Sequence, residues 1–195
     1  MIQTDAVRAY FDSHADQWDA GMVRNEAAIS AILDAAGIHA GTDVLDVACG
    51  TGVLFPDYQK RQVRSLTGVD LSPEMACRAR EKYPWATVLC GDAMQLEPKQ
   101  TFDAIVIYNA FPHFPKPEQL LAHLSTLLRP GGRLTVAHGM SREALLLHHS
   151  GSASAVSLEL PEAKALGHMM GQFLTVDIIL SDLEKYIVSG QKESR

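Results

Sequence analysis

The segment Asp46–Gly52 combines a carboxylate with a glycine turn directly after an apolar stretch. Gly50 and Gly52 permit a tight turn whose backbone amides can approach a ligand closely. A second carboxylate, Asp70, ends the apolar segment Gly68–Asp70 about 20 residues further on. An acid at the tip of the second strand of a Rossmann-type sheet can accept hydrogen bonds from ribose hydroxyls. The sequence therefore predicts a site for a ligand that contains a nucleoside.

The spacing of the glycines narrows the choice of nucleoside. A dinucleotide fingerprint needs a third glycine three residues after the second, but Phe55 stands there. The turn also lacks the Lys-Ser/Thr pair of a phosphate loop. Asp46 would repel a pyrophosphate, whereas it suits a ligand that carries positive charge. S-adenosylmethionine, with its sulfonium and ammonium groups, is such a ligand.

Val44–Gly52 resembles the cofactor loop of the Rossmann-like S-adenosylmethionine-dependent methyltransferases, whose usual form is V-L-D-[VI]-G-C-G-T-G. Ala48 stands where that form has glycine. Further motifs of the family follow in the expected order, namely the acidic second strand, the G-D-A element that contacts adenine, the fourth strand and the turn into the fifth: Gly68–Ser72, Gly91–Ala93, Phe102–Val106 and Leu128–Leu134. The resemblance covers most of the chain and implies a methyltransferase. The alternative is a degenerate Rossmann domain without activity.

The resemblance also implies which residues bind the cofactor. Asp70 would hold the ribose, or it only caps the helix that begins at Ser72. Asp92 would contact adenine N6, or it is an ordinary turn residue. Asp46 would lie beside the amino-acid end of the cofactor. The full expected set is Tyr10, Trp18, Asp46, Ala48, Gly50, Thr51, Gly52, Asp70, Leu71, Asp92, Ala93 and Asn109.

The segment Tyr10–Asp19 is similar to the Y-[FY]-[DN]-x-x-A-x-x-[WY]-[DE] opening of the small-molecule branch of this family. In that branch the segment closes over the cofactor, where aromatic side chains can exclude water. The alternative is that Tyr10, Phe11 and Trp18 simply dock the first helix on the sheet.

The residues after the fourth strand bear on the methyl acceptor. Nucleic-acid amino methyltransferases typically carry [DN]-P-P-[YF] here, but this chain has Asn109-Ala110-Phe111-Pro112. With a net charge of −6 and no basic stripe, this mismatch argues against DNA or RNA as the substrate. The segment looks more like the ubiquinone/menaquinone-type branch, which often has a histidine near the methyl-transfer path. His113 fits that position, either as a base or as a residue that shapes the pocket.

The second half of the chain is rich in histidine and is expected to supply the acceptor site. The expected acceptor-binding residues are Phe111, His113, His138, His148 and His149. Imidazoles are also common metal ligands, although neither H-x-x-x-H nor C-x-x-C spacing occurs. The main interpretation needs no metal. Two alternatives stay open, namely a metal-bound or sulfur/metalloid acceptor and a non-catalytic subunit that binds S-adenosylmethionine.

The predicted elements that position these residues alternate along the chain. Strands are expected at 43–47, 65–70, 86–90, 102–108 and 132–137, and a closing hairpin at 173–180 and 186–188. Helices are expected at 24–36, from Ser72-Pro73 onward, at 117–129 and at 141–150. The pattern predicts a doubly wound, mostly parallel seven-stranded sheet with an antiparallel C-terminal hairpin and helices on both faces. Residues 189–195 are predicted to be a frayed tail.

Composition sets the remaining expectations. With 195 residues and 47% hydrophobic content, the chain suits a single domain. We expect an N-terminal lid and first helix at 1–40 and a core at 41–190, with an acceptor cap at about 138–172. There is neither an apolar run long enough to span a membrane nor a secretion signal. The three cysteines are expected to be reduced, which predicts a cytoplasmic protein. The oligomeric state is not predicted.

Overall fold

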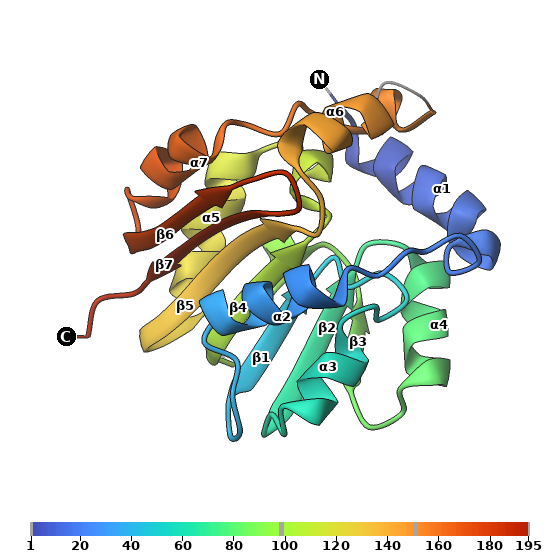
Figure 1. Ribbon diagram of the computed structural model, residues 1–195. Coiled ribbons are helices and arrows are strands. Elements are labelled where there is room, and N and C mark those ends of the chain that lie inside the picture. The colour runs from blue at the N-terminus through green and yellow to red at the C-terminus, as the bar shows by residue number, and fades with distance from the viewer. Residues whose placement is uncertain (1, 98–99, 150–151, 195) are drawn as a thin grey trace.

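The computed structural model describes residues 2–97, 100–149 and 152–194. Within these ranges the centre is a seven-stranded sheet with the order β3-β2-β1-β4-β5-β7-β6 (Figure 1). The strands are β1 (Asp43–Val47), β2 (Ser65–Asp70), β3 (Thr87–Cys90), β4 (Phe102–Tyr108), β5 (Leu128–His138), β6 (Thr175–Ser181) and β7 (Tyr186–Gln191). Strands β1 to β5 pair in parallel, whereas β7 is antiparallel to both β5 and β6. The predicted mostly parallel sheet with an antiparallel C-terminal hairpin is confirmed.

Helices cover both faces of the sheet (Figure 1). One face carries α2 (Glu26–Ala35), α3 (Phe55–Lys60) and α4 (Pro73–Lys82), and the other carries α5 (Pro117–Thr126) and α7 (Ala163–Met170). Two further helices, α1 (Thr4–His14) and α6 (Arg142–His149), lie toward the carboxyl ends of the parallel strands. Four short 3₁₀ turns complete the described elements: η1 (Ala15–Gln17), η2 (Ala93–Gln95), η3 (Phe111–His113) and η4 (Ser152–Val156).

The central strands are buried on both faces because their side chains alternate between two hydrophobic clusters. In β1, Leu45 and Val47 pack in the cluster under α5 and α7, whereas Val44 packs in the cluster under α2, α3 and α4. Asp46 shares the face of Val44. This alternation decides which side chains at the strand ends can reach a ligand.

Local signals explain most helix boundaries. Ser72 caps α4 by accepting a hydrogen bond from the Met75 amide at 3.1 Å, as its sequence predicts. Asn25 caps α2 in the same way, so this helix begins at Glu26. Helix α5 ends at Thr126, earlier than predicted, because Leu128 already pairs with Phe102 in the sheet.

The prediction of a frayed tail from residue 189 is wrong, because β7 continues to Gln191. Ser189 is fully buried, and its hydroxyl lies 2.8 Å from that of Thr135 and donates to the Ala35 carbonyl at 3.1 Å. The polar side chain of Ser189 therefore forms its hydrogen bonds inside the protein. Its residue type alone suggested an exposed position.

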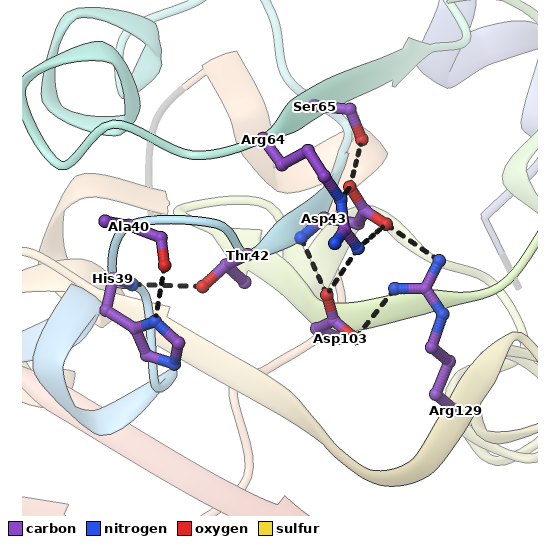
Figure 2. A network of polar contacts seen from close by, with 8 residues as sticks. All are labelled: His39, Ala40, Thr42, Asp43, Arg64, Ser65, Asp103 and Arg129. Carbon is purple, nitrogen blue, oxygen red and sulfur yellow. Dashed lines mark hydrogen bonds and ion pairs between the residues drawn. The ribbon is translucent and has the colours of Figure 1, made fainter.

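A network of charged side chains joins the amino ends of β1, β2 and β4 to β5 (Figure 2). Arg129 donates to Asp103 at 2.7 Å and forms an ion pair with Asp43 at 2.7 Å. Asp43 also accepts from Arg64 and Ser65, and its backbone amide donates to Asp103. The network lies at the sheet edge opposite the carboxyl ends of these strands, so we assign it to stability.

Candidate functional site

A cavity of about 800 Å³ lies at the carboxyl ends of the parallel strands and is bordered by α1. This is where ligands bind in open α/β sheets. Ten of the residues predicted for the site line it: Trp18, Ala48, Gly50, Thr51, Asp70, Leu71, Asp92, Ala93, Asn109 and His113. Residues far apart in the sequence thus meet at one place, as the motif order predicts.

The loop after β1 turns through three left-handed residues. Ala48, Gly50 and Gly52 have φ values of 56°, 55° and 86°. Ala48 therefore adopts, at the position of the family's glycine, a conformation that costs an L-residue roughly 1–2 kcal/mol. Gly52 does not line the cavity, and its freedom serves packing: a Cβ there would meet the Tyr83 ring at 2.8 Å.

Asp70 joins the first two loops of the site. Its carboxylate accepts a hydrogen bond from the Gly50 amide at 2.7 Å and another from the Ser72 amide at 2.9 Å. Burial raises the pKa of Asp70 to about 6, and the two amide hydrogen bonds limit this rise. A carboxylate oxygen can accept more than one hydrogen bond, so Asp70 can hold the glycine loop and a ligand hydroxyl together. The helix-capping alternative and the ligand-binding role are therefore compatible.

Asp46 is buried behind the loop and does not line the cavity. Burial raises the pKa of Asp46 to about 8, and the Tyr58 hydroxyl opposes this rise while the charge of Asp70 adds to it. Asp46 shares the inward-facing side of β1 with Val44, which is why it lies near α3 instead of on the cavity wall. At neutral pH, a carboxyl with this pKa is largely protonated.

Asp92 and Asn109 lie on the cavity wall at the ends of β3 and β4. Asp92 caps the 3₁₀ turn η2 by accepting from the Met94 amide at 2.9 Å. Asn109 has a left-handed φ of 54°, and its side-chain oxygen accepts from the Gly139 amide at 3.0 Å. Each side chain is thus fixed by a backbone contact.

The N-terminal segment, residues 4–24, closes one side of the cavity. Val7, Phe11 and His14 line it from one face of α1, which matches helical spacing. Trp18 follows, with its indole Nε1 4.0 Å from the position of a Cβ on Gly50. Phe11 packs edge-on against Trp18 and His113, at ring-centroid distances of 5.4 and 4.9 Å.

Three aspartates hold this segment to the rest of the protein. Asp12 accepts a hydrogen bond from the Ser72 hydroxyl, and Asp16 pairs with Arg78. Asp19 accepts from the Thr51 hydroxyl at 2.6 Å and pairs with Lys82 at 2.7 Å. Partial burial alone would raise the pKa of Asp19, but the hydrogen bonds from Lys82 and Thr51 hold it below the ordinary value.

His113 lies on η3 at the cavity wall. Its Nδ1 is 3.0 Å from the Val156 carbonyl oxygen and 3.2 Å from the Ser157 hydroxyl. A carbonyl can only accept, so Nδ1 carries the hydrogen, and in the neutral ring the basic nitrogen is Nε2. Burial lowers the pKa of His113, and the hydrogen bond to Val156 opposes this effect. The ring is therefore neutral at physiological pH.

Besides Asp46 and Gly52, three predicted site residues lie away from the cavity wall. Tyr10 stacks on His14 at 4.2 Å because it faces sideways from the stripe of Val7 and Phe11. Phe111 is buried in the cluster under α5. His138, expected to bind the acceptor, is fully buried and packs edge-on against Tyr186, with ring centroids 5.9 Å apart. Strand alternation puts His138 on the inward face of β5, and its sequence position alone did not show this.

The side chains of His148 and His149 lie outside the described part of the structure. Among the described residues, no group of three or more His, Cys, Asp or Glu side chains could hold a metal ion. In the same part of the chain, no helix has the length and apolar character needed to cross a bilayer. The sequence analysis did not anticipate the cavity positions of Lys116, Gln119 and Met140. The sequence offered one hint, because Lys116-Pro117 begins the helix after β4.

Comparisons with known proteins agree with this geometry. Residues 44–132 match the family model described as a methyltransferase domain. A phosphatidylethanolamine N-methyltransferase of Cereibacter sphaeroides is 34% identical over 117 residues, which are 56% of this chain and 57% of that protein. A demethylmenaquinone methyltransferase of Renibacterium salmoninarum is 30% identical over 141 residues, which are 68% of this chain and 58% of that protein. The chain spans about half the length of the curated relatives it matches.

A solved structure extends the likeness of fold to nearly the whole chain. Magnesium protoporphyrin IX methyltransferase from Synechocystis, with bound S-adenosylhomocysteine, superposes with a TM-score of 0.75 at 19% identity. The alignment covers 98% of this chain and 100% of that chain. Residues 44–132 therefore match a methyltransferase domain, and the solved structure shows the same fold over nearly the whole chain.

Proposed function

We propose that this protein transfers a methyl group from S-adenosylmethionine to a small-molecule acceptor. The observation that carries the proposal is Asp70, a cavity-wall carboxylate that also holds the Gly50 amide of the glycine loop. Its position at the end of β2 suits hydrogen bonds from the two ribose hydroxyls. The relatives that methylate phosphatidylethanolamine and demethylmenaquinone support a small molecule as the acceptor. We propose no nucleic-acid substrate, in keeping with the net charge of −6.

Different cavity residues would contact different parts of the cofactor. Asp70 would hold the ribose, and Asp92 and Ala93 at the end of β3 would contact the adenine. Trp18 beside Gly50 would cover the adenosyl group and exclude water. Asp46 is too deeply buried for direct contact, so we assign it to support of the loop that carries Ala48 and Gly50.

When bound, the cofactor supplies a methyl group that is already activated by the sulfonium charge. Transfer forms a bond from an acceptor oxygen, nitrogen, sulfur or carbon to the methyl carbon and breaks the carbon–sulfur bond. S-adenosylhomocysteine leaves as the product, and a hydroxyl acceptor also loses its proton. The chain contributes mainly alignment of the two molecules, which can supply several kcal/mol of the barrier, about 7–11 in the best-oriented cases.

His113 is our candidate for the group that accepts this proton. The Val156 carbonyl fixes the hydrogen on Nδ1, which leaves Nε2 as the basic nitrogen of a neutral ring. The lowered pKa of His113 keeps that ring neutral at physiological pH, so it is ready to act as a base. If the acceptor is already anionic, the same residue only shapes the pocket.

Substitution of His113 separates these roles. Once an acceptor is in hand, His113→Ala should lower turnover by roughly 10²–10⁴-fold if the residue is a base, with affinity for S-adenosylhomocysteine nearly unchanged. The wild-type rate should rise with pH only below about 6.5, since burial lowers the pKa of His113. A pH profile that survives the substitution would assign His113 to pocket shape. Unchanged turnover and acceptor affinity would contradict its place in the acceptor site.

The organisation of the chain follows from the same proposal. Residues 1–40 would supply the lid and first helix, 41–190 the core, and 138–172 the acceptor cap. The three free cysteines, Cys49, Cys77 and Cys90, fit a reducing compartment such as the cytoplasm.

A further inference from the structure

The start of α5 brings two polar side chains to the wall of the cavity. Lys116 immediately precedes the helix, Gln119 lies in its first turn, and both line the cavity. Neither residue belongs to the cofactor motifs of the chain. His113 lies three residues before Lys116 and lines the same cavity.

The charged groups of the cavity wall differ in how they are held. Asp70 accepts from two backbone amides, and Asp92 caps η2. Arg24 pairs with Asp57 at 2.6 Å and with Glu26 at 2.8 Å. Within the described residues, Lys116 has no such hydrogen bond or ion pair. It is therefore the charged wall residue whose ammonium group is available to a ligand.

The position of Lys116 relative to Asp70 and Asp92 indicates that it lies in the part of the cavity that binds the acceptor. Asp70 and Asp92 follow β2 and β3, on one side of β1, whereas Lys116 follows β4 on the other side. The cavity around Lys116 is otherwise largely apolar, with Phe114 and Leu120 on the same stretch of chain. A flat apolar molecule with one anionic group would complement this part of the wall.

We propose that Lys116, assisted by Gln119, binds an anionic substituent of the methyl acceptor, so that the acceptor is a small aromatic acid. This inference rests on the proposed function. The Cα atoms of His113 and Lys116 lie at most about 11 Å apart along the chain, so one small molecule can contact both residues.

Electrostatics favours an anionic acceptor during methyl transfer as well as during binding. The cofactor carries a positive sulfonium, and Lys116 adds a second positive charge near the acceptor. The sulfonium stabilises a hydroxyl that is becoming an oxyanion, since opposite charges within about 4–6 Å favour the ionised form, and Lys116 balances the charge of the anionic substituent. A neutral acceptor of the same shape gains less from either charge.

Binding of two matched probes tests this inference without any need for turnover. Dihydroxybenzoic acid and dihydroxybenzamide share ring and hydroxyls and differ in the charge of one substituent. Each is titrated by calorimetry into the protein saturated with S-adenosylhomocysteine. We expect the acid to bind about tenfold more tightly than the amide, which corresponds to about 1.4 kcal/mol. Lys116→Ala should abolish this preference, and Lys116→Arg should retain most of it.

Controls separate the inference from the proposed function. Lys60→Ala, an exposed lysine on α3 that does not line the cavity, should keep the preference. Affinity for S-adenosylhomocysteine should be the same in Lys116→Ala and wild type. A wild-type protein that does not bind S-adenosylhomocysteine would contradict the proposed function instead. Equal affinity for acid and amide, a preference that survives in Lys116→Ala, or no detectable binding of either probe would overturn the inference.

Discussion

At the scale of single residues, Asp70 does two jobs with one carboxylate. Its hydrogen bonds to the Gly50 and Ser72 amides fix the glycine loop against the second strand. The same group faces the cavity, where burial keeps its pKa at about 6. On the proposed function, ligand binding and loop structure would depend on the same charge.

This pKa predicts how cofactor affinity depends on pH. Only the ionised carboxylate accepts hydrogen bonds with both oxygens, so affinity for S-adenosylhomocysteine should fall as pH drops below about 6. Asp70→Asn should weaken binding by about 1.5–3 kcal/mol at pH 7.5 and should remove this pH dependence. Calorimetric titration at pH values from about 5 to about 8, a range that spans the pKa of Asp70, measures both effects.

A control and a contradicting result accompany this prediction. Asp182 lies in the turn between β6 and β7 and does not line the cavity. The control variant Asp182→Asn should therefore change neither the affinity nor its pH dependence. Unchanged affinity in folded Asp70→Asn would remove Asp70 from the binding site.

At the scale of elements, the N-terminal segment is held over the cavity by charges. Asp19 contributes most directly, since it binds both Thr51 in the glycine loop and Lys82 on α4. Asp12 and Asp16 contact the same helix through Ser72 and Arg78. These contacts give the predicted lid a specific means of attachment.

Loss of one attachment should speed the release of ligand. Asp19→Ala should raise the dissociation rate of S-adenosylhomocysteine about three- to tenfold, because partly exposed ion pairs and hydrogen bonds contribute about 1 kcal/mol each. Stopped-flow displacement measures this rate directly. Asp5→Ala is the matched control, since Asp5 pairs only with Arg8 of its own helix in the described contacts. Equal rates for both variants and wild type would show that the segment does not gate the cavity.

At the scale of the whole molecule, the sheet is fixed at both ends. The carboxyl ends of the strands carry the cavity, and the amino ends carry the network of Asp43, Arg64, Asp103 and Arg129 (Figure 2). The hydrogen bond from Arg64 is the main reason that the pKa of Asp43 lies far below its ordinary value. Hydrogen bonds from the Asp43 amide and from Arg129 lower the pKa of Asp103, although burial opposes this.

These lowered pKa values set the direction of acid sensitivity. Each carboxylate stabilises the fold above the unfolded pKa of about 4, and this contribution is lost as pH falls through the lower folded value. Arg129→Ala should therefore cost about 1–3 kcal/mol at pH 7 and should flatten the loss of stability below pH 4. Urea unfolding at several pH values tests both points. A variant as stable and as acid-sensitive as wild type would contradict the assigned role.

Sequence patterns predicted the sheet and most of the loop residues that line the cavity, because glycine turns and strand-end acids are local signals. Ala48, Gly50 and Asp70 needed only their neighbours in sequence to be placed. His138 and Phe111 were misplaced because strand alternation and a short turn decide which way each side chain faces. The contact between Asp19 and Thr51 was missed because it joins distant segments through the tertiary fold, which no sequence spacing shows. The cavity position of Lys116 was missed because this residue lies outside the cofactor motifs.

The most direct test of the whole account compares two adenosine-containing ligands in the same cavity. Calorimetric titration of the wild-type protein with S-adenosylhomocysteine and with NAD measures which one binds. The glycine turn lacks the third glycine of a dinucleotide site, with Phe55 in its place. We predict one site for S-adenosylhomocysteine and no measurable binding of NAD. Comparable affinity for NAD, or no binding of S-adenosylhomocysteine, would contradict the account.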